Sequence, residues 1–306
     1  MKKPKVALLC GGNSPEREVS LKGGQAVAEA LRRRGYPVEV FDPPGDLPLL
    51  AQRVREFDLA FPVLHGPGGE DGTIQGFLEA LGLPYLGAGV LGSALAMDKF
   101  LSKLLYREVG LKVPDFVLVR KGERPSPLKI PFPVVVKPVS QGSSVGISLV
   151  EDEEGLREAL SLAFRYEERV LVEEKLSGRE LTVGILGETP LPVVEIRPGA
   201  GHRFFDYQAK YTPGATEELC PAPIPDEIAS AAKKAAFLAH QALNLRHVSR
   251  TDFILTETGD LYVLETNTLP GLTETSLLPL AARTAGLSFE DLVEKMVALV
   301  LATGVA

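Results

Sequence analysis

Short apolar segments separated by an amphipathic stretch open the chain. Residues 5–10, 37–41 and 58–64 are almost entirely apolar, which is typical of parallel strands buried on both faces. Between the first two, apolar residues from Leu21 to Leu31 recur at helical spacing. This alternation of strands and helices predicts an N-terminal doubly wound α/β domain with a parallel sheet, covering residues 1–95.

The pattern changes after this unit, and strands become more frequent. We expect one helix at about 90–109, followed by strands in PFPVVVKP and GISLV. The segment EDEEGLREALSLAF carries apolar residues on one helical face, and RVLVEE reads as a strand that closes the block. A second, α+β domain over residues 96–178 is therefore expected.

The last block, residues 179–306, is predicted to be a third domain, also α+β. Strands are expected at 180–186 and 190–196, and helices at about 225–243 and at the end of the chain. The polar, glycine-rich stretch from Pro198 to Glu218 is longer than most structural connections. Such a length is typical of an active-site cover or of disorder.

Composition excludes several classes of protein. The 306 residues are 45% hydrophobic and 24% charged, as in ordinary globular domains, and the net charge of −7 argues against a general nucleic-acid binder. Two cysteines cannot build a disulfide scaffold. The first apolar run, Val6 to Cys10, is too short for a signal peptide, and no stretch approaches membrane-spanning length. We therefore expect a soluble, cytoplasmic protein.

The stretch RTDFILTETGDLYVLETN, residues 250–267, predicts a β-hairpin. With Thr258-Gly259 as a two-residue loop, Glu257 pairs with Asp260. The same register places Asp252 opposite Glu265 and Arg250 opposite Asn267, all on one face. The other face is expected to carry Phe253, Leu255, Tyr262 and Leu264.

Two carboxylates directly opposite each other should repel, unless a cation lies between them. Asp252, Glu265 and the amide of Asn267 offer hard oxygen ligands suited to Mg²⁺. A solvated hairpin face with Arg250 neutralising one carboxylate explains the pattern about equally well. The following TLPGLTETSLLP places backbone N–H groups beside the same face and favours the metal.

A second candidate site is VVVKPVSQGSSVG, where Lys137 ends a buried strand and a Gly- and Ser-rich loop follows. Such a loop can fold over phosphates, but it matches neither the P-loop nor the dinucleotide pattern. Taken alone, a hairpin turn with an exposed lysine is the better interpretation. Lys99 and the acidic pair Glu173-Glu174 lie in the same block, and the pair offers a carboxylate and a backbone edge to an adenine or ribose.

Polar residues also follow the first and third predicted strands, where α/β proteins bind ligands. In LLCGGNSPEREVS, Glu16 is a candidate acceptor for a substrate ammonium and Ser20 a candidate helix cap. In LHGPGGEDG, His65 is followed by Glu70 and Asp71. A structural role for His65 is at least as plausible as a catalytic one.

Seven segments together resemble one known family. In chain order they are GGNSPEREVSLKGG, HGPGGEDGTIQG, MDKF, KPVSQGSSVG, DYQAKY, RTDFIL and LETNTLPGLTETSLLP. They are similar to those of the D-alanine–D-alanine ligases, which are ATP-grasp enzymes, and they extend from about residue 5 to about residue 300. The resemblance implies the ATP-grasp fold, with two α+β domains enclosing the nucleotide behind the N-terminal domain.

The resemblance also implies a reaction. ATP phosphorylates the carboxylate of one D-alanine, and the amine of a second attacks the acyl phosphate. D-Alanyl-D-alanine, ADP and phosphate are released, and the dipeptide serves peptidoglycan synthesis. Two Mg²⁺ ions (or Mn²⁺), potassium activation, a homodimer and a cytoplasmic location are implied as well, with no nucleic-acid or membrane partner.

Residue roles are carried over onto the matching positions. Glu16 would bind the first ammonium, Arg250 and the Gly271 N–H the developing charge, and Ser276 with the Leu277 N–H the second carboxylate. The implied metal ligands are Asp252, Glu265 and Asn267. The implied catalytic residues are Glu16, Ser143, Tyr211, Arg250, Gly271 and Ser276. The implied nucleotide- and substrate-binding residues are Lys99, Lys137, Ser144, Glu173, Glu174, Leu176, Glu180, Lys210 and Leu277.

Tyr211 carries the finest inference on specificity. In the family, a tyrosine hydrogen-bonded towards a serine (here Ser143) and Glu16 marks dipeptide formation rather than ester formation. DYQAKY therefore favours an amine as second substrate, and Tyr211→Phe is expected to raise the ratio of D-lactate to D-alanine product.

Three other functions compete with this one. An ATP-grasp ligase with another acceptor, such as D-lactate or D-serine, differs only in its product. A non-catalytic nucleotide sensor would retain the fold but would not release phosphate in response to D-alanine. A dehydrogenase is disfavoured because its glycine-rich cofactor loop is missing.

Overall fold

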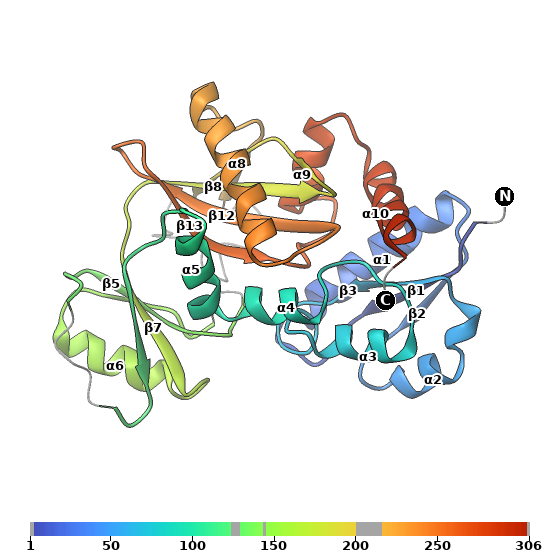
Figure 1. Cartoon of the computed structure of the whole chain (residues 1–306), viewed down its shortest axis with the longest axis horizontal. Coiled ribbons are helices and arrows are strands. Elements are labelled where there is room, and N and C mark those ends of the chain that lie inside the picture. The colour runs from blue at the N-terminus through green and yellow to red at the C-terminus, as the bar shows by residue number, and fades with distance from the viewer. Residues whose placement is uncertain (1–2, 124–128, 143–144, 200–215, 305–306) are drawn as a thin grey trace.

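The computed structural model describes residues 3–123, 129–142, 145–199 and 216–304. It contains a three-stranded, a four-stranded and a six-stranded sheet, each with helices against it (Figure 1). The predicted α/β class, with one parallel sheet and two α+β units, is confirmed in the described residues.

The N-terminal sheet is parallel, in the order β2-β1-β3, with β1 at Val6–Cys10, β2 at Val38–Phe41 and β3 at Leu59–Val63. All three predicted strands are thereby confirmed. Helix α1 (Arg17–Arg33) packs on one face, where the apolar positions of its helical pattern are buried. The other face is covered by α2 (Leu47–Gln52) and α3 (Thr73–Leu81), which join a separate core with Phe41 and Tyr85.

The helix predicted at about 90–109 is two helices, α4 (Val90–Met97) and α5 (Lys99–Glu108). Asp98 separates them because its backbone is extended and its side chain accepts hydrogen bonds from the N–H groups of Phe100 (3.1 Å) and Leu101 (2.9 Å). Apolar periodicity continues through this cap, so the pattern alone did not indicate the break. The break orients Lys99, the first residue of α5.

The middle sheet is antiparallel, in the order β4-β7-β5-β6. Its core is apolar, and α6 (Glu153–Ala163) covers one face. The bounds of its strands are β4 Phe116–Arg120, β5 Val134–Pro138, β6 Ser148–Val150 and β7 Arg169–Glu174.

The C-terminal sheet is antiparallel, in the order β11-β10-β8-β12-β13, with β9 paired to β8. Helix α8 (Asp226–Ala242) lies across one face, and α9 (Leu277–Thr284) and α10 (Phe289–Thr303) follow the last strand. The strand bounds are β8 Arg179–Leu186, β9 Thr189–Pro190, β10 Val194–Pro198, β11 Thr216–Leu219, β12 Val248–Leu255 and β13 Leu261–Asn267.

The β12–β13 hairpin corrects two predictions and confirms a third. Its loop has three residues, because Thr256 rather than Glu257 pairs with Asp260, and Gly259 adopts φ +84°. A β-bulge between Asp252 and Phe253 then restores the predicted register, so that Asp252 faces Glu265 and Arg250 faces Asn267. The predicted Glu257–Asp260 pair and two-residue loop were wrong, and the register at the carboxylates was right.

The bulge also changes which side chains share the apolar face. Phe253 pairs with Val263, and both are fully buried, whereas Leu264 lines a pocket together with Glu265. The prediction that Tyr262 and Leu264 pack beside Phe253 was therefore wrong, since one extra residue in a strand shifts the alternation by one position.

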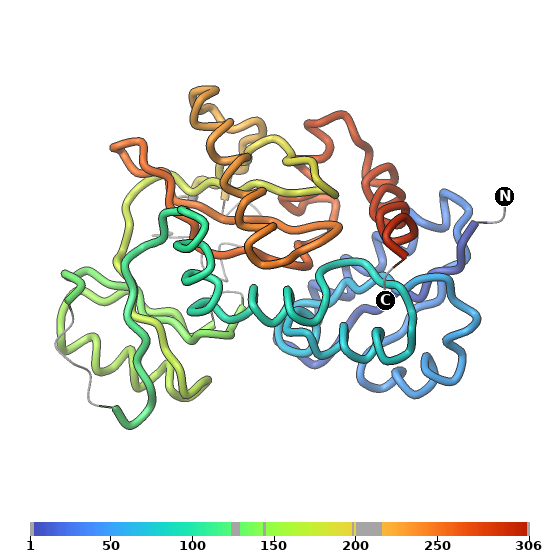
Figure 2. The backbone as a smooth tube through the Cα atoms, viewed as in Figure 1, coloured from blue at the N-terminus to red at the C-terminus, as the bar shows by residue number. Residues whose placement is uncertain are grey.

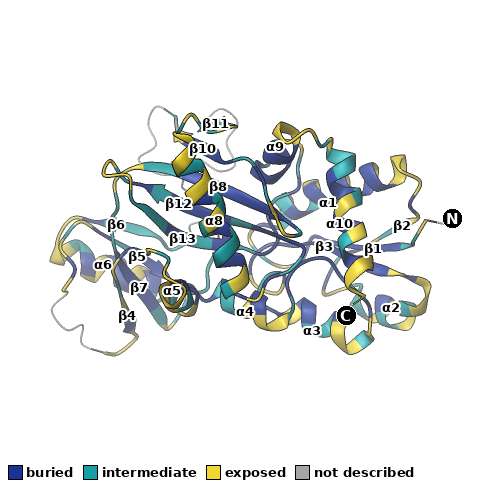
Figure 3. Ribbon diagram, turned by 45° about the horizontal axis from the view of Figure 1, so that its top comes forward, coloured by how far each residue is buried: buried dark blue, intermediate teal, exposed yellow. Residues whose placement is uncertain are grey.

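Two cores extend across the predicted domain boundaries. Helix α5 packs on the C-terminal sheet, where the Tyr106 hydroxyl donates to Thr266 Oγ1 at 2.8 Å. Helix α10 lies beside α1 (Figure 2), and Arg33 Nε is 2.9 Å from Glu290 Oε1. The domain boundaries near residues 95 and 178 stay a prediction. Figure 3 shows buried strands enclosed by helices whose outer faces are exposed.

Among the described residues, no helix combines the length and the apolar character needed to span a membrane.

Candidate active site

The site is organised by one face of β12 and β13. Asp252 is 6% exposed, and Arg250 binds it with two hydrogen bonds of 2.9 Å, from Nε to Oδ1 and from Nη2 to Oδ2. Thr182 Oγ1 donates to Asp252 Oδ1 at 2.6 Å, and Asn267 Nδ2 donates to Oδ2 at 3.2 Å. The Asp252 carboxylate is thus fixed from both neighbouring strands.

The two facing carboxylates are compensated by different cations. Arg250 pairs with Asp252, and Lys99 Nζ lies 3.7 Å from Glu265 Oε2. Burial opposes the charged form of Arg250, but the charge and hydrogen bonds of Asp252 outweigh it and raise the arginine pKa. Arg250 is therefore a permanent cation in the centre of the site.

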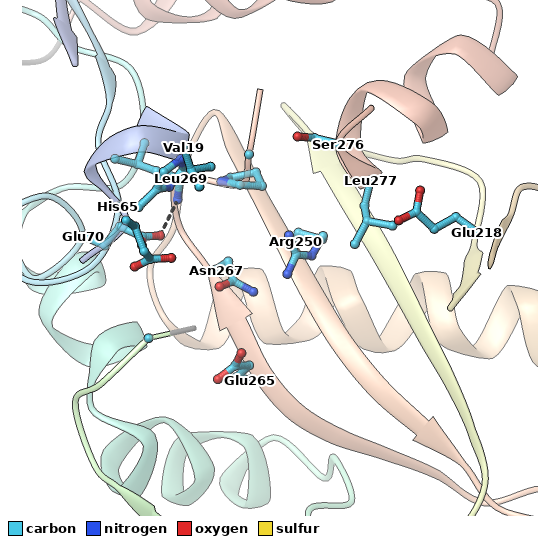
Figure 4. Close-up of a pocket in the computed structure, with 14 residues that line it drawn as sticks. Val19, His65, Glu70, Glu218, Arg250, Glu265, Asn267, Leu269, Ser276 and Leu277 are labelled. Atoms are coloured by element: carbon cyan, nitrogen blue, oxygen red, sulfur yellow. Dashed lines mark hydrogen bonds between the residues drawn. The ribbon is translucent and has the colours of Figure 1, made fainter. Parts of the chain in front are cut away.

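One side of this face forms a cavity of about 130 Å³, here called the Arg250 pocket. It lies between the N-terminal and C-terminal sheets, and Figure 4 shows its side chains converging from both. Its polar lining consists of Glu16, His65, Glu70, Glu218, Arg250, Glu265, Asn267 and Ser276, with Gly142, Gly271 and Leu277 beside them.

Glu70 ties together two loops of this pocket. Its Oε2 accepts from the Gly66 N–H at 2.9 Å and its Oε1 from the Leu269 N–H at 3.2 Å, so it joins the loop after β3 to the loop after β13. Burial, and then the charge of Glu16, raise the pKa of Glu70 to about 7. Neighbouring His65 is 8% exposed, and burial lowers its pKa.

The start of α9 closes the pocket. Ser276 precedes the helix but does not cap it; its hydroxyl accepts instead from the Thr273 N–H at 3.1 Å. Leu277, the first residue of α9, lines the pocket, and a helix N-terminus favours an anion such as a carboxylate.

A second and larger cavity, of about 450 Å³, also borders the β12–β13 hairpin and is here called the Lys137 pocket. It lies between the middle and C-terminal sheets. Its apolar walls include Val135, Leu149, Leu176, Ile254 and Leu264, and its polar lining includes Lys99, Lys137, Glu173, Glu174, Glu180, Asp252 and Glu265.

A buried ion-pair group fixes Lys137 in that pocket. Glu173, 3% exposed, has Oε2 at 2.8 Å from Lys137 Nζ and Oε1 at 3.2 Å from Lys103 Nζ. Burial opposes ionisation of Glu173, but the two ammonium groups outweigh it and hold its pKa below its usual value. Burial lowers the pKa of the fully enclosed Lys103 to about 8.

The two pockets meet at the β12–β13 face. Glu265 lines both, Asp252 lines the Lys137 pocket, and Arg250 lines the Arg250 pocket. An elongated anion in the lysine-bearing pocket would therefore place its end beside a small polar chamber that holds a fixed guanidinium. Such an arrangement is suited to group transfer between the two ligands.

The donors on this face fit one kind of metal. Among the described residues, no three His, Cys, Asp or Glu side chains lie close enough to hold an ion unaided. Two facing carboxylates and an amide instead match Mg²⁺, which takes a few carboxylates and completes its shell with substrate phosphates and water.

Comparison with known proteins decides the family. The sequence pattern described as "D-ala D-ala ligase C-terminus" matches residues 105–298, and its N-terminal counterpart matches residues 46–88. The D-alanine–D-alanine ligase of Syntrophobacter fumaroxidans is 48% identical over 97% of both chains, and that of Syntrophotalea carbinolica 46% identical over 97% of this chain and 96% of its own. The chain belongs to the D-alanine–D-alanine ligase family.

Solved structures give the same answer for the fold. The D-alanine–D-alanine ligase of Bacillus anthracis, crystallised with ATP, superposes with a TM-score of 0.87 at 32% identity and covers 98% of both chains. The ATP-grasp fold predicted from the sequence is thereby confirmed.

Within this family frame, most residues predicted for the site lie in the two pockets. Glu16, Arg250, Gly271, Ser276 and Leu277 line the Arg250 pocket. Lys99, Lys137, Glu173, Glu174, Leu176, Glu180 and Asp252 line the Lys137 pocket, Glu265 lines both, and Asn267 lines the Arg250 pocket. Ser143, Ser144, Lys210 and Tyr211 lie outside the described residues.

Lys103, Glu70 and Glu218 are buried or pocket-lining residues to which the sequence motifs assign no role. Lys103 follows Lys99 by four residues, so helical spacing indicated a shared face, and Glu70 follows His65 in a noted loop. Glu218 was noted only as the end of the predicted covering stretch from Pro198, and the pairing of β11 with β10 brings it to the pocket.

Proposed function

We propose that the chain joins two D-alanines to D-alanyl-D-alanine at the expense of ATP, through a D-alanyl phosphate, in peptidoglycan precursor synthesis. The observation that carries the proposal is the shared wall of the two pockets, where Glu265, Asp252 and the Arg250 guanidinium meet. Family membership supplies the substrates.

In this proposal the Lys137 pocket holds the nucleotide. Its volume and apolar walls suit an adenine, with Leu176 and the backbone at Glu174 beside the base and Glu180 near the ribose. Lys99 and Lys137 meet the phosphates, with Ser144 and Lys210 assigned to the same task by family resemblance. Because Glu173 is already engaged by two lysines, we assign it first to holding Lys137 in place.

The Arg250 pocket receives the amino acids. Glu16 takes the ammonium of the first D-alanine, and Arg250 with the Gly271 N–H meets the charge that develops on its carboxyl oxygen. Ser276 and the Leu277 N–H bind the carboxylate of the second D-alanine at the start of α9. Ser143 and Tyr211 complete this arrangement by resemblance alone.

The residues that would hold Mg²⁺ (or Mn²⁺) are Asp252, Glu265 and Asn267. When bound, the metal would neutralise the charge of the β- and γ-phosphates. Arg250 holds the Asp252 carboxylate in the orientation needed for this task. The proposal also includes a cytoplasmic location, where ATP is available, and activation by potassium.

The decisive experiment measures phosphate release with ATP, Mg²⁺ and either D- or L-alanine, with the product identified by mass spectrometry. Release that requires the D-isomer, together with the dipeptide mass, is the expected result. Release without alanine, or a product formed only with D-lactate or D-serine, would contradict the proposal.

We also propose a homodimer. Helices α4 and α5 each carry two large exposed apolar side chains, namely Val90, Leu91, Leu101 and Leu104, which a second copy would cover. Light scattering should give about twice the 32.9 kDa mass of the chain, and a monomer mass at micromolar concentration would contradict it.

A further inference from the structure

Glu218 lines the Arg250 pocket and has no role in the function proposed so far. It lies on β11, where it pairs with Ile196 of β10, and it lines the Arg250 pocket. Figure 4 shows it beside Leu277 and near Ser276, across the pocket from His65 and Glu70. It is therefore next to the helix start proposed to bind the second carboxylate.

Within the described part of the chain, Glu218 is held only weakly. Its one hydrogen bond is from Thr216 Oγ1 to Oε1, at the limiting distance of 3.5 Å, and it belongs to no ion pair there. Partial burial raises the pKa of Glu218 above its usual value. A carboxylate in such a setting gains from a cationic ligand.

The neighbouring Glu217 shows the contrast. Its side chain is 65% exposed, and Oε2 lies 3.7 Å from Nη1 of Arg197, on the other face of the strand. One residue apart, the two glutamates differ in exposure, in partner and in access to the pocket. They form a matched pair for experiment.

The chemistry of the chamber calls for a second ammonium acceptor. Under the proposed function it holds two D-alanines, and Glu16 serves the ammonium of the first. The ammonium of an α-amino acid lies within about 3 Å of its carboxylate, so its acceptor must stand close to the site that binds that carboxylate. Of the acids lining the pocket, Glu70 is engaged by two backbone N–H groups, and Glu265 lies towards the Lys137 pocket.

We propose that Glu218 binds the ammonium of the second D-alanine, beside the Ser276–Leu277 carboxylate site, and thereby selects an amino acid over a hydroxy acid. This inference rests on the proposed function and adds to it a residue that determines the second substrate. Because D-lactate has no ammonium, a carboxylate here favours D-alanine and gives no advantage to D-lactate.

The test compares Glu218→Gln and Glu218→Asp with Glu217→Gln in the full-length enzyme. Initial rates over a range of D-alanine concentrations give a separate Michaelis constant (KM) for each of the two alanines. In Glu218→Gln the KM for the second alanine should rise about 10- to 100-fold, because a charged hydrogen bond is lost. The KM values for the first alanine and for ATP should stay within about twofold of those of the parent enzyme. Glu218→Asp should recover part of the loss, and Glu217→Gln should match the parent enzyme.

Competition between D-alanine and D-lactate gives a second measurement, the ratio of the two products. This ratio would not change if Glu218 had only a structural role. The ratio of D-alanyl-D-lactate to D-alanyl-D-alanine should rise in Glu218→Gln and stay unchanged in Glu217→Gln. The inference would be overturned if Glu218→Gln left the KM for the second alanine unaltered, or if it changed the KM values for both alanines and ATP equally. Failure of the parent enzyme to make the dipeptide would instead overturn the proposed function.

Discussion

The Lys137 pocket and the Arg250 pocket share a wall but balance their charges differently. In the Lys137 pocket, carboxylates meet lysines, as Glu173 does with Lys137 and Lys103. In the Arg250 pocket, Glu70 is held by backbone N–H groups and Glu218 by a hydroxyl. The first pocket is suited to a polyanion, and the second to zwitterions that bring their own cations. A family resemblance does not reveal this difference, because it assigns roles one residue at a time.

The largest effect is expected at the shared wall. Arg250→Met removes the cation that lines the Arg250 pocket and orients Asp252 of the Lys137 pocket, and turnover at saturating substrates should fall by about 10²- to 10³-fold. Phosphate release measures it. Arg250→Lys keeps the charge but not the paired hydrogen bonds, so its turnover should lie in between. Loss of less than about threefold in Arg250→Met would mean that the guanidinium does not meet the reacting group.

A change at Lys103 should separate the two pockets. In Lys103→Met, Glu173 has Lys137 as its remaining partner and binds it more tightly, so Lys137 is less available to phosphates. The KM for ATP should rise about tenfold, equivalent to about 1.4 kcal/mol, with the KM values of both D-alanines unchanged.

The matched control for Lys103 is Lys112→Met, a surface lysine whose Nζ is 2.5 Å from Asp260 Oδ1. This variant should leave every kinetic constant unchanged. Equal losses for ATP and D-alanine in Lys103→Met would show that the two pockets are not independent.

Glu70 should give the Arg250 pocket a pH-dependent stability. Folding raises its pKa from 4.5 to about 7, so the folded state favours the protonated carboxyl. The stability that this proton provides is fully present below pH 4.5 and is lost as the pH rises through about 7. Between about pH 5 and pH 8 the free energy of unfolding should therefore fall relative to Glu70→Gln, on the order of 2 kcal/mol. Urea unfolding at both pH values measures the difference, and parallel pH curves for the two proteins would contradict it.

The smallest effect is expected outside both pockets, at the hairpin tip. Gly259 has φ +84° and open space around its Cα, so Gly259→Ala should destabilise the fold by about 1 kcal/mol through backbone strain alone. Turnover should be unchanged, as measured by phosphate release beside thermal unfolding. A lower turnover would link the tip of the hairpin to the carboxylates at its base.

Much of the fold followed from periodicity, because buried parallel strands and amphipathic helices have distinct patterns. The exceptions are local. Asp98 ended a helix within a continuous apolar pattern, since a side-chain cap outweighs periodicity. In the hairpin, a three-residue loop and a bulge compensate each other, so the register at Asp252 and Glu265 was predicted correctly from an incorrect turn.

Site prediction succeeded where chemistry is concentrated in short motifs. Asp252, Glu265 and Arg250 lie on adjacent strands of one hairpin, and alternation was enough to place them together. Glu218 and Lys103 could not be assigned in this way. Their environments depend on β10 and β7, which are distant in sequence, and a single sequence carries no pairing information between such strands.

Helix α10 has a consequence for how the chain is made. Its apolar side, with Met296 and Val300, completes the core beneath α1 and the first sheet, and Arg33 is paired with Glu290. A growing polypeptide emerging from the ribosome must therefore expose part of its earliest hydrophobic surface until α10 has been synthesised as well. Burial of that first layer has to wait for α10, and a chain shortened before α10 would leave the core beneath α1 exposed.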